Sequence, residues 1–450
     1  MKNHKTIREI TEKFITQLNS SFMRESLSVS PDNRHVAYAV HKHGLFTKNK
    51  SFVVVNGQEG EHFDGIGIKS ITFSHDSQRI AYAAQAGNKT TVVIDSHNGK
   101  QYNGIMAGMP IFSPDSQKVV YVAQDGNKWF VVADGTEQKY YDGIGEGTPI
   151  FSLDGQKMAY AAKLDNKFFV VVNGQEGKYY DGIGDLVFSP DGQKMAYVAL
   201  LGKRLFLTRD GVEEEIAFDL VGYGSLIFSP NNQRLAYAAG TGDKQLVVID
   251  EQVGKPYDGI NVQKPIFSPN SQSVAYAAQE NSKWFVVVDG QPGKPYDNYV
   301  DNTFSFSPNN LRTAYAAKKG NKQIVVIDDN EQRECDGTAL GTPLFSPDSQ
   351  HLAYACRIGT KWFVHINEQE YGPYDGAGPI AFSPDSQHVA WRTQIGHKEF
   401  VVIDGQEGRQ YDGIVNIGGG HIIFDAADRL HYLALKNTSI FLVDEIIQEK

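Results

Sequence analysis

The chain has 450 residues, of which 41% are hydrophobic, so it is long enough to bury a large core. Its formal net charge is -10 and its lysines are spread along the chain, which argues against a nucleic acid as partner. No run approaches the roughly 20 apolar residues of a membrane helix, and the first residues lack the apolar stretch of a secretory signal. We therefore expect a cytoplasmic protein that does not bind membranes.

The first predicted element is a short amphipathic helix over residues 6–19. Ile7, Ile10, Phe14 and Leu18 recur there at helical spacing, with charged residues between them. We expect this helix to dock on the rest of the protein; the alternative is a helix for partner binding or self-association. Residues 20–24 come next, where a closing strand is expected, so that 1–26 forms an N-terminal segment.

From residue 27 onward the chain is a tandem repeat with a period of about 39 residues. In each copy a serine, usually followed by Pro-Asp or Pro-Asn, precedes a short Ala-Tyr run, and an eleventh, degenerate copy spans 424–432. The repeated serines are Ser30, Ser74, Ser113, Ser152, Ser189, Ser229, Ser268, Ser307, Ser346 and Ser383. Such a period defines a repeat architecture, and it assigns most recurring residues to the scaffold.

One unit, residues 147–184, shows four short apolar runs at 149–152, 158–162, 168–172 and 178–181. Turn sequences such as Asp154-Gly155 and Asn173-Gly174 separate them. The third run is apolar at every position, as expected for a strand that is covered on both faces. The repeats therefore predict an all-β fold, a β-propeller of about eleven four-stranded blades over residues 27–450.

Eleven blades exceed the roughly four to eight of a typical propeller, and two arrangements remain open. We favour a single large ring, because no linker interrupts the period and the last repeat stops after its third strand, at 441–444. The alternative is two consecutive rings with a break near 206–224. There Glu213-Glu214-Glu215 replaces the usual Lys-Tyr-Tyr-Asp-Gly.

The string Phe-Ser-Pro-Asp-Gly-Gln-Lys-Met-Ala-Tyr at 188–197 resembles the repeat of TolB-type, WD-like propellers, which is also found in prolyl-oligopeptidase-like enzymes. The resemblance covers about 27–444. It implies a fold rather than an activity, because the repeat occurs in translocation proteins, protease gating domains and scaffolds. The chain departs from both relatives, since no export signal is visible and the blades leave no room for a hydrolase domain with a Gly-x-Ser-x-Gly elbow.

Lysine begins the third predicted strand of the first ten repeats, and an acidic or amide residue ends the fourth. Because the start of one antiparallel strand lies beside the end of the next, we expect a structural ion pair in each blade. The clearest examples are Lys128 with Asp142, Lys167 with Asp181, and Lys283 with Asp297. The alternative, a ring of carboxylates that binds cations, is opposed by the interleaved lysines.

The residue directly after the repeated lysine varies between repeats. It reads Ser51, Thr90, Trp129, Phe168, Arg204, Gln245, Trp284, Gln323, Trp362 and Glu399. This mixture implies partial exposure, and exposed tryptophan with arginine is typical of protein interfaces. We therefore predict that Trp129, Phe168, Arg204, Trp284 and Trp362 bind a protein partner. The alternative is that large side chains at this position fill gaps between blades.

No calcium loop, Walker loop, dinucleotide fingerprint or nucleophile elbow is found, so we expect no cofactor, no metal and no enzymatic activity. The favoured function is a protein-interaction scaffold that presents one propeller face. The alternative is a small-ligand binder or enzyme that acts from the central channel. Residues expected there, Glu146, Asp185, Gln263, Lys264 and Asp301, show no convergent pattern.

Two minor features complete the sequence. Histidines gather near the two ends of the repeat array, among them His41, His43, His421 and His431, which leaves a metal site open as a further alternative. The two cysteines, at 335 and 356, are not expected to form a disulfide framework, which favours a reducing compartment.

Overall fold

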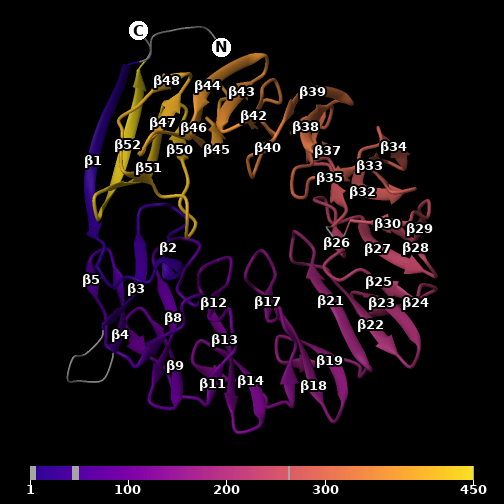
Figure 1. Ribbon diagram of the computed structural model, residues 1–450. Coiled ribbons are helices and arrows are strands. Elements are labelled where there is room, and N and C mark those ends of the chain that lie inside the picture. The colour runs from indigo at the N-terminus through magenta and orange to yellow at the C-terminus, as the bar shows by residue number, and fades with distance from the viewer. Residues whose placement is uncertain (1–6, 43–49, 262–263, 449–450) are drawn as a thin grey trace. The chain divides into compact units, whose positions relative to one another are not determined.

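The computed structural model describes residues 7–42, 50–261 and 264–448, which form eleven sheets of four or five strands (Figure 1). We number these sheets as blades 1–11 in chain order. The predicted all-β fold of about eleven propeller blades is confirmed. The chain divides into two compact units, one of residues 15–219 with 417–420 and one of the remaining residues. The number of rings stays a prediction.

Blades 1–5 belong to the unit of residues 15–219, which we call the N-terminal unit. A single 3-10 turn, Arg24–Ser26, precedes blade 1. The strands are β2 (Ser28–Val29), β3 (Val36–Lys42), β4 (Lys50–Val55) and β5 (Gln58–Glu59) in blade 1; β6 (Gly65–Ile66), β7 (Thr72–Phe73), β8 (Ile80–Ala86), β9 (Lys89–Ile94) and β10 (His97–Asn98) in blade 2; β11 (Gly104–Ile105), β12 (Ile111–Phe112), β13 (Val119–Asp125), β14 (Lys128–Ala133) and β15 (Thr136–Glu137) in blade 3; β16 (Gly143–Ile144), β17 (Ile150–Phe151), β18 (Met158–Leu164), β19 (Lys167–Val172) and β20 (Gln175–Glu176) in blade 4; and β21 (Gly182–Phe188), β22 (Met195–Leu201), β23 (Arg204–Arg209) and β24 (Val212–Ile216) in blade 5.

Blades 6–11 belong to the other unit, which we call the C-terminal unit. The strands are β25 (Leu220–Val221), β26 (Ile227–Phe228), β27 (Leu235–Thr241), β28 (Lys244–Ile249) and β29 (Gln252–Val253) in blade 6; β30 (Gly259–Ile260), β31 (Ile266–Phe267), β32 (Val274–Glu280), β33 (Lys283–Val288) and β34 (Gln291–Pro292) in blade 7; β35 (Asn298–Tyr299), β36 (Ser305–Phe306), β37 (Thr313–Lys319), β38 (Lys322–Ile327) and β39 (Asn330–Cys335) in blade 8; β40 (Gly337–Thr338), β41 (Leu344–Phe345), β42 (Leu352–Ile358), β43 (Lys361–Ile366) and β44 (Gln369–Tyr374) in blade 9; β45 (Gly376–Phe382), β46 (Val389–Ile395), β47 (Lys398–Ile403) and β48 (Gln406–Glu407) in blade 10; and β49 (Gly413–Ile414), β50 (Ile423–Ala426), β51 (Arg429–Lys436) and β52 (Ser439–Gln448) with β1 (Ile7–Gln17) in blade 11.

Blade 4 shows why each repeat forms such a sheet. Its two central strands, β18 and β19, pair antiparallel around a tight turn in which Asp165 and Asn166 have φ of 48° and 61°. Positive φ at both turn residues matches the twist of the flanking strands, and Asp and Asn tolerate it. The first strand is split into β16 and β17, both paired with β18. The fourth is short, because β20 is followed only by a bridge between Phe168 and Tyr180.

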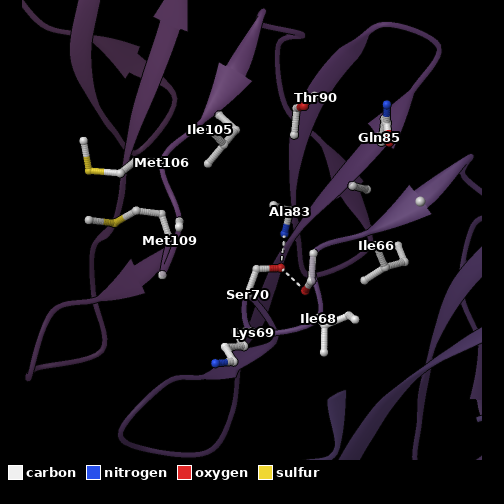
Figure 2. Close-up of a pocket in the computed structure, with 15 residues that line it drawn as sticks. Ile66, Ile68, Lys69, Ser70, Ala83, Gln85, Thr90, Ile105, Met106 and Met109 are labelled. Atoms are coloured by element: carbon white, nitrogen blue, oxygen red, sulfur yellow. Dashed lines mark hydrogen bonds between the residues drawn. The ribbon is translucent and has the colours of Figure 1, made fainter. Parts of the chain in front are cut away.

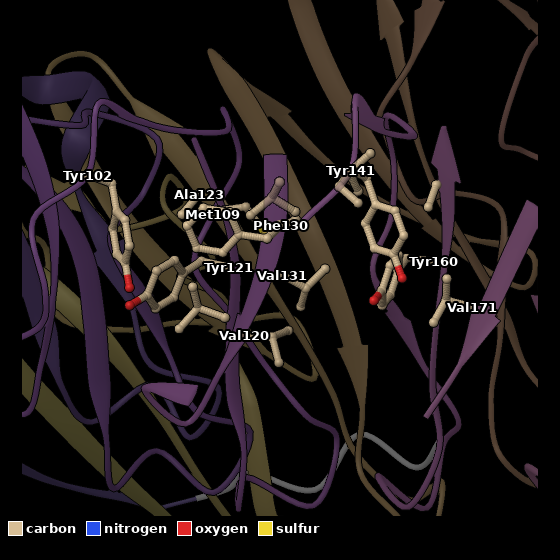
Figure 3. Packing of buried hydrophobic residues seen from close by; sticks show 14 of the residues in the cluster. Tyr102, Met109, Val120, Tyr121, Ala123, Phe130, Val131, Tyr141, Tyr160 and Val171 are labelled. Atoms are coloured by element: carbon tan, nitrogen blue, oxygen red, sulfur yellow. The ribbon is translucent and has the colours of Figure 1, made fainter. Parts of the chain in front are cut away.

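The core lies between neighbouring blades, where pairs of buried tyrosines meet edge to face. In the cluster of Figure 3, Tyr102 packs on Tyr121 and Tyr141 packs on Tyr160, each pair with ring centroids 6.2 Å apart. Edge-to-face contact is the geometry that aromatic quadrupoles favour. Equivalent pairs are Tyr180–Tyr197, Tyr257–Tyr276, Tyr296–Tyr315 and Tyr411–Tyr432. The repeated aromatic residues are therefore scaffold.

The predicted N-terminal helix is wrong. Residues Ile7–Gln17 form strand β1, which lies beside β52 in blade 11 (Figure 1). Arg8, Ile10 and Glu12 are the half-buried side chains of an alternating pattern, so the period is that of a strand. The helical spacing was overridden because the last repeat lacks an outer strand, and the hydrogen bonds of that strand outweigh a weak local preference.

We considered docking, partner binding or self-association as roles of that helix. Because Ile7–Gln17 is a strand, none of these roles applies in the predicted form. Residues 20–24 do not close the last blade either, because Phe22 forms a bridge with Val40 in blade 1. Within the three described ranges, no helix is long and apolar enough to cross a membrane.

Charged side chains attach β1 to blades 10 and 11. Arg8 Nε donates to Glu445 Oε2 at 2.6 Å, and both side chains are buried. A second guanidinium nitrogen of Arg8 donates to the carbonyl of Gln406 at 2.8 Å. Glu12 accepts from Arg409 at 2.8 Å and also pairs with Lys436. Hydrogen bonds from these partners outweigh burial and lower the pKa of Glu12 to about 2.

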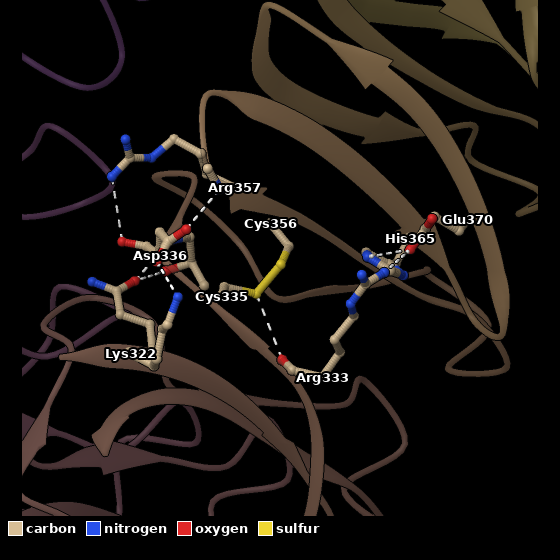
Figure 4. The surroundings of a disulfide bond; sticks show 11 residues. Lys322, Arg333, Cys335, Asp336, Cys356, Arg357, His365 and Glu370 are labelled. Atoms are coloured by element: carbon tan, nitrogen blue, oxygen red, sulfur yellow. Dashed lines mark hydrogen bonds and ion pairs between the residues drawn. A yellow bond between two sulfur atoms is a disulfide. The ribbon is translucent and has the colours of Figure 1, made fainter. Parts of the chain in front are cut away.

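The two cysteines form a disulfide bond, which corrects the expectation of unpaired thiols (Figure 4). Cys335 ends β39 in blade 8, and Cys356 lies in β42 of blade 9. Other blade junctions have tyrosine at the position of Cys335, as in Tyr102 and Tyr141. The disulfide thus replaces a packing contact with a covalent link between two blades.

Candidate functional site

The repeated lysine and aspartate side chains lie together in both units. The Nζ–Oδ1 distances are 2.7 Å for Lys128–Asp142, 2.6 Å for Lys167–Asp181 and 2.5 Å for Lys283–Asp297. Further pairs are Lys50–Asp64, Lys244–Asp258, Lys322–Asp336, Lys361–Asp375 and Lys398–Asp412.

The second carboxylate oxygen of these aspartates contacts the next blade. Asp181 Oδ2 accepts from the backbone N–H of Gly202 in the β22–β23 turn at 2.7 Å, and Asp142 Oδ2 accepts from Asp165 at 2.9 Å. The hydrogen bond from Lys167, followed by that from Gly202, lowers the pKa of Asp181. Both oxygens are occupied by protein donors, which supports a structural role and opposes cation binding.

The repeats supply their own test of this contact. Blade 2 has Asn103 at the position of Asp181, and Asn103 Oδ1 still accepts from the Gly126 N–H at 3.0 Å. We expect Asp181→Asn to shift Tm by less than about 1 °C, because the amide keeps that bond and an exposed ion pair contributes little. Asp181→Ala loses the acceptor and should lower Tm by about 2 °C. Differential scanning calorimetry checks this; equal shifts for both variants would contradict it.

The predicted partner-binding residues are mostly half-buried. Trp129, Trp284 and Trp362 pack against clusters of apolar side chains that extend over two or three neighbouring blades. Phe168 is half-buried under the Lys163 ammonium, 5.4 Å from the ring centroid. Arg204 is exposed and pairs with Glu215 at 3.1 Å. It begins β23 as Lys167 begins β19, so it lies at the position of the repeated lysine and not at the variable position after it. The tryptophan packing fits the alternative interpretation, in which this position fills gaps between blades.

Polar residues at the same position also reach the next blade. Gln245 Oε1 accepts from the backbone N–H of Ile260 at 2.7 Å, and Gln323 Oε1 accepts from that of Thr338 at 2.7 Å. Glu399 Oε2 accepts from Ile414 at 2.6 Å. In each case the donor is the second residue of the first strand in the next blade. The position after the lysine therefore serves the junction between blades, through either an aromatic ring or an acceptor oxygen.

Blade 2 departs from this rule, because the residue is Thr90. A cavity of about 490 Å³ lies between blades 2 and 3 at this place (Figure 2). Blade 2 contributes Lys69, Ser70, Ala83 and Thr90 to its lining, and blade 3 contributes Ile105, Met106 and Met109. Ser70 Oγ accepts from the Ala83 N–H at 2.9 Å and donates to the Gly67 carbonyl at 2.6 Å, which fixes the loop below the cavity.

Sequence reasoning did not identify this cavity as a site. The signal was present in the variable position, where Thr90 and Ser51 are the smallest residues of the series. The small size of these residues could not be interpreted from the sequence, because the sequence does not show that the position after the repeated lysine faces the next blade.

A second group that the sequence did not single out follows the outer edges of blades 3–5. Tyr140 is 40% exposed and Tyr179 is 44% exposed, at equivalent positions of adjacent blades. Tyr140 stacks on Phe130 with centroids 4.2 Å apart. Lys139, beside Tyr140 in the sequence, pairs with Glu176 at 2.8 Å. In the same way Lys178, beside Tyr179, pairs with Glu213 in β24 of blade 5 at 2.5 Å. We call Lys139, Tyr140, Glu176, Lys178, Tyr179 and Glu213 the edge strip.

The residues expected at a central channel do not form a recognisable site. Glu146, Lys264 and Asp301 are exposed, Asp185 is buried, and Gln263 lies outside the described residues. Asn261 Nδ2 donates to Asp301 at 2.6 Å.

The histidine alternative gains no support from the described residues, which contain no group of three or more potential metal ligands. His43 lies outside them. His41 Nδ1 lies 2.8 Å from Ser51 Oγ, and His431 Nδ1 lies 2.7 Å from Asp425.

Comparisons with protein-family models and with curated protein sequences found no match. Among solved structures, the chain is similar to a eukaryotic initiation factor, with 14% identity, 73% of this chain and 92% of that chain covered, and a TM-score of 0.38. It is also similar to TolB from Acinetobacter baumannii, with 17% identity, coverage of 57% and 78%, and a TM-score of 0.28. The β-propeller domain of the Trilobed protease from Pyrococcus furiosus matches with 12% identity, coverage of 81% and 98%, and a TM-score of 0.31. At these values the neighbours carry no argument about function.

Proposed function

We propose that this chain is a non-enzymatic scaffold that binds a protein partner along the edge strip of blades 3–5. The observation that carries the proposal is the exposure of Tyr140 and Tyr179 on adjacent blades. Tyrosine combines a flat apolar ring with a hydroxyl and loses little conformational entropy on binding, so it is enriched in protein interfaces.

The chemistry of the strip suggests the chemistry of the partner. Lys139 and Lys178 alternate with Glu176, Glu213 and the two tyrosines, so charges of both signs flank apolar rings. A polypeptide that packs apolar side chains on the rings, with polar groups beside them, fits this pattern. The recurring lysine–aspartate pairs are engaged within and between blades, which leaves the strip as the more distinctive surface of the N-terminal unit.

Site-specific photocrosslinking tests the proposal. A benzophenone amino acid is placed at Tyr140 or Tyr179 and, as matched controls, at Gln101 and Gln410, the exposed equivalents in blades 2 and 10. We expect one protein to be crosslinked from both tyrosine positions and not from Gln410. The Tyr140→Ser/Tyr179→Ser variant should bind that purified protein at least about 10-fold more weakly. Equal crosslinking at Gln410, or unchanged affinity, would reject the strip as the interface.

Four of the predicted partner-binding residues are half-buried, so only their exposed edges are accessible to a partner: Trp129, Phe168, Trp284 and Trp362. Their role in binding a partner stays a prediction. We expect their truncation to act first on the packing of neighbouring blades. The Trp284→Ala/Trp362→Ala variant distinguishes the two roles, because a contact role predicts lost affinity with unchanged Tm.

The cytoplasmic location also stays a prediction, and part of its basis is gone. The cysteines were expected to be unpaired, whereas Cys335 and Cys356 are bonded. Structural disulfides are rare in the cytosol of mesophiles, since glutathione and thioredoxin keep thiols reduced. The disulfide therefore argues against the reducing compartment that the sequence led us to expect.

A further inference from the structure

The outer edge of blade 11 is longer than that of any other blade. Its outer strand, β1, has 11 residues, whereas the outer strands of the other ten blades have two to six. Within the described residues β1 pairs only with β52 and ends the strand order of its sheet (Figure 1). Native proteins usually keep edge strands short or cover them, because an open edge leaves a row of backbone N–H and C=O groups that another strand can pair with. Blade 11 therefore has an edge on which a further strand can be added.

The side chains of this edge alternate regularly between Ile7 and Lys13. Glu9, Thr11 and Lys13 are exposed on one face of the strand, and the residues between them are half-buried. The Lys13 ammonium has no ion-pair partner among the described residues. Glu9 makes only a long contact of 3.5 Å with the side-chain amide of Gln448. Two charges of opposite sign are thus free to meet charges on an added strand.

The spacing of these two charges is self-complementary. A twofold axis perpendicular to the sheet places two copies of an edge strand antiparallel, and side chains of the same face lie opposite one another. If the axis passes beside Thr11, Glu9 of each copy lies opposite Lys13 of the other copy. Opposite charges in this position stabilise a strand pair. A shift of the axis by one residue in either direction leaves both charges without a partner, so the charges select one register.

We propose that the outer edge of β1 is the contact surface of a homodimer, in which the β1 strands of two copies pair antiparallel around Thr11. β1 then completes blade 11 through its inner edge and joins a second copy through its outer edge, by the same backbone hydrogen bonding. The proposal goes beyond the scaffold function, and β1 shares no residue with the edge strip. A single pair of strands is a small interface, so we expect Kd of about 10–100 µM.

Sedimentation velocity over about 5–200 µM protein tests the proposal with charge reversals. Glu9→Lys and Lys13→Glu each place like charges opposite one another at both symmetric contacts, and each should weaken dimerisation at least about 10-fold. An equimolar mixture of the two variants should dimerise like the wild type, because each altered residue then faces an opposite charge on the other variant. Glu407→Lys is the matched control, since it makes the same change at an exposed position of β48, the outer strand of blade 10. It should keep the wild-type Kd.

A cysteine at the axis tests the register directly. Residues that lie opposite one another in antiparallel strands have Cα atoms about 4.5–5.5 Å apart, which a disulfide can bridge. The native cysteines are bonded to each other, so an introduced thiol has no native partner. Under mild oxidation Thr11→Cys should give a covalent dimer on a non-reducing gel, and Glu407→Cys should remain a monomer.

Circular dichroism and Tm establish that every variant is folded. The proposal is overturned if the wild type stays monomeric at about 200 µM, which would leave the edge to a strand of a different protein. It is also overturned if the wild type dimerises and both charge reversals dimerise equally well, because the copies then associate elsewhere. Failure of the mixed variants to associate, or no crosslink from Thr11→Cys, would reject the pairing around Thr11.

Discussion

Glu445→Ala is expected to lower the free energy of unfolding of the C-terminal unit by about 3–5 kcal/mol. Glu445 is fully buried and Arg8 is 7% exposed, so the variant leaves a buried guanidinium without its carboxylate. It also removes the acceptor of the Tyr432 hydroxyl, which donates to Glu445 Oε1 at 2.6 Å. Because Arg8 belongs to β1, the loss should appear first as release of that strand. Hydrogen exchange read by mass spectrometry, together with denaturant unfolding, measures both effects.

Glu9→Ala is the control for this prediction. It removes a carboxylate from the same strand at an exposed position and should change stability by less than about 0.5 kcal/mol. Exchange should accelerate in Ile7–Gln17 and Ser439–Gln448 for Glu445→Ala and remain at the wild-type rate for Glu9→Ala. Unchanged exchange in both strands of the Glu445 variant would show that β1 does not depend on the buried pair.

Loss of the Cys335–Cys356 bond has the second-largest expected effect. The cysteines are separated by 21 residues in the sequence, and a closed loop of this size corresponds to about 3 kcal/mol of stabilisation by the chain-entropy argument. Both residues are buried, so their truncation in Cys335→Ala/Cys356→Ala also removes packing between blades 8 and 9. We expect a lower denaturation midpoint for this variant, measured by denaturant unfolding.

The repeats provide the matched control for the disulfide. Cys335→Tyr/Cys356→Ala restores the tyrosine and alanine found at equivalent positions of other junctions, such as Tyr102 with Ala123. This variant should be more stable than the double alanine variant and insensitive to reducing agent, whereas the wild type should lose stability in dithiothreitol. A wild-type midpoint that does not change on reduction would mean that the bond contributes no stability.

The repeat pattern allowed the blades to be predicted well. The apolar run at 168–172 lies in β19, and the run at 158–162 lies in β18, each correct to within about two residues at its ends. These elements were predictable because their pairing is local: the strands are joined by a tight turn whose residues, Asp165 and Asn166, favour positive φ. The same holds for Lys167 with Asp181, which are neighbours across a single hairpin.

The features that failed prediction depend on contacts distant in sequence or between blades. Ile7–Gln17 reads as a helix by spacing, and only the unfilled edge of β52, more than 400 residues away, makes it a strand. Cys335 and Cys356 belong to different blades, and their Cα atoms are brought within 5.7 Å by the way blades 8 and 9 pack.

The sequence by itself determined the all-β repeat fold, the boundaries of the central strands and eight of the predicted lysine–aspartate pairs, because the physical causes of these features lie within about 40 residues. The tertiary structure decided which strand completes blade 11, which thiols meet and where a cavity remains. Thr90 illustrates the reason. A threonine in the sequence does not indicate a cavity, and the cavity that it lines is seen only when the packing of blade 3 against blade 2 is known.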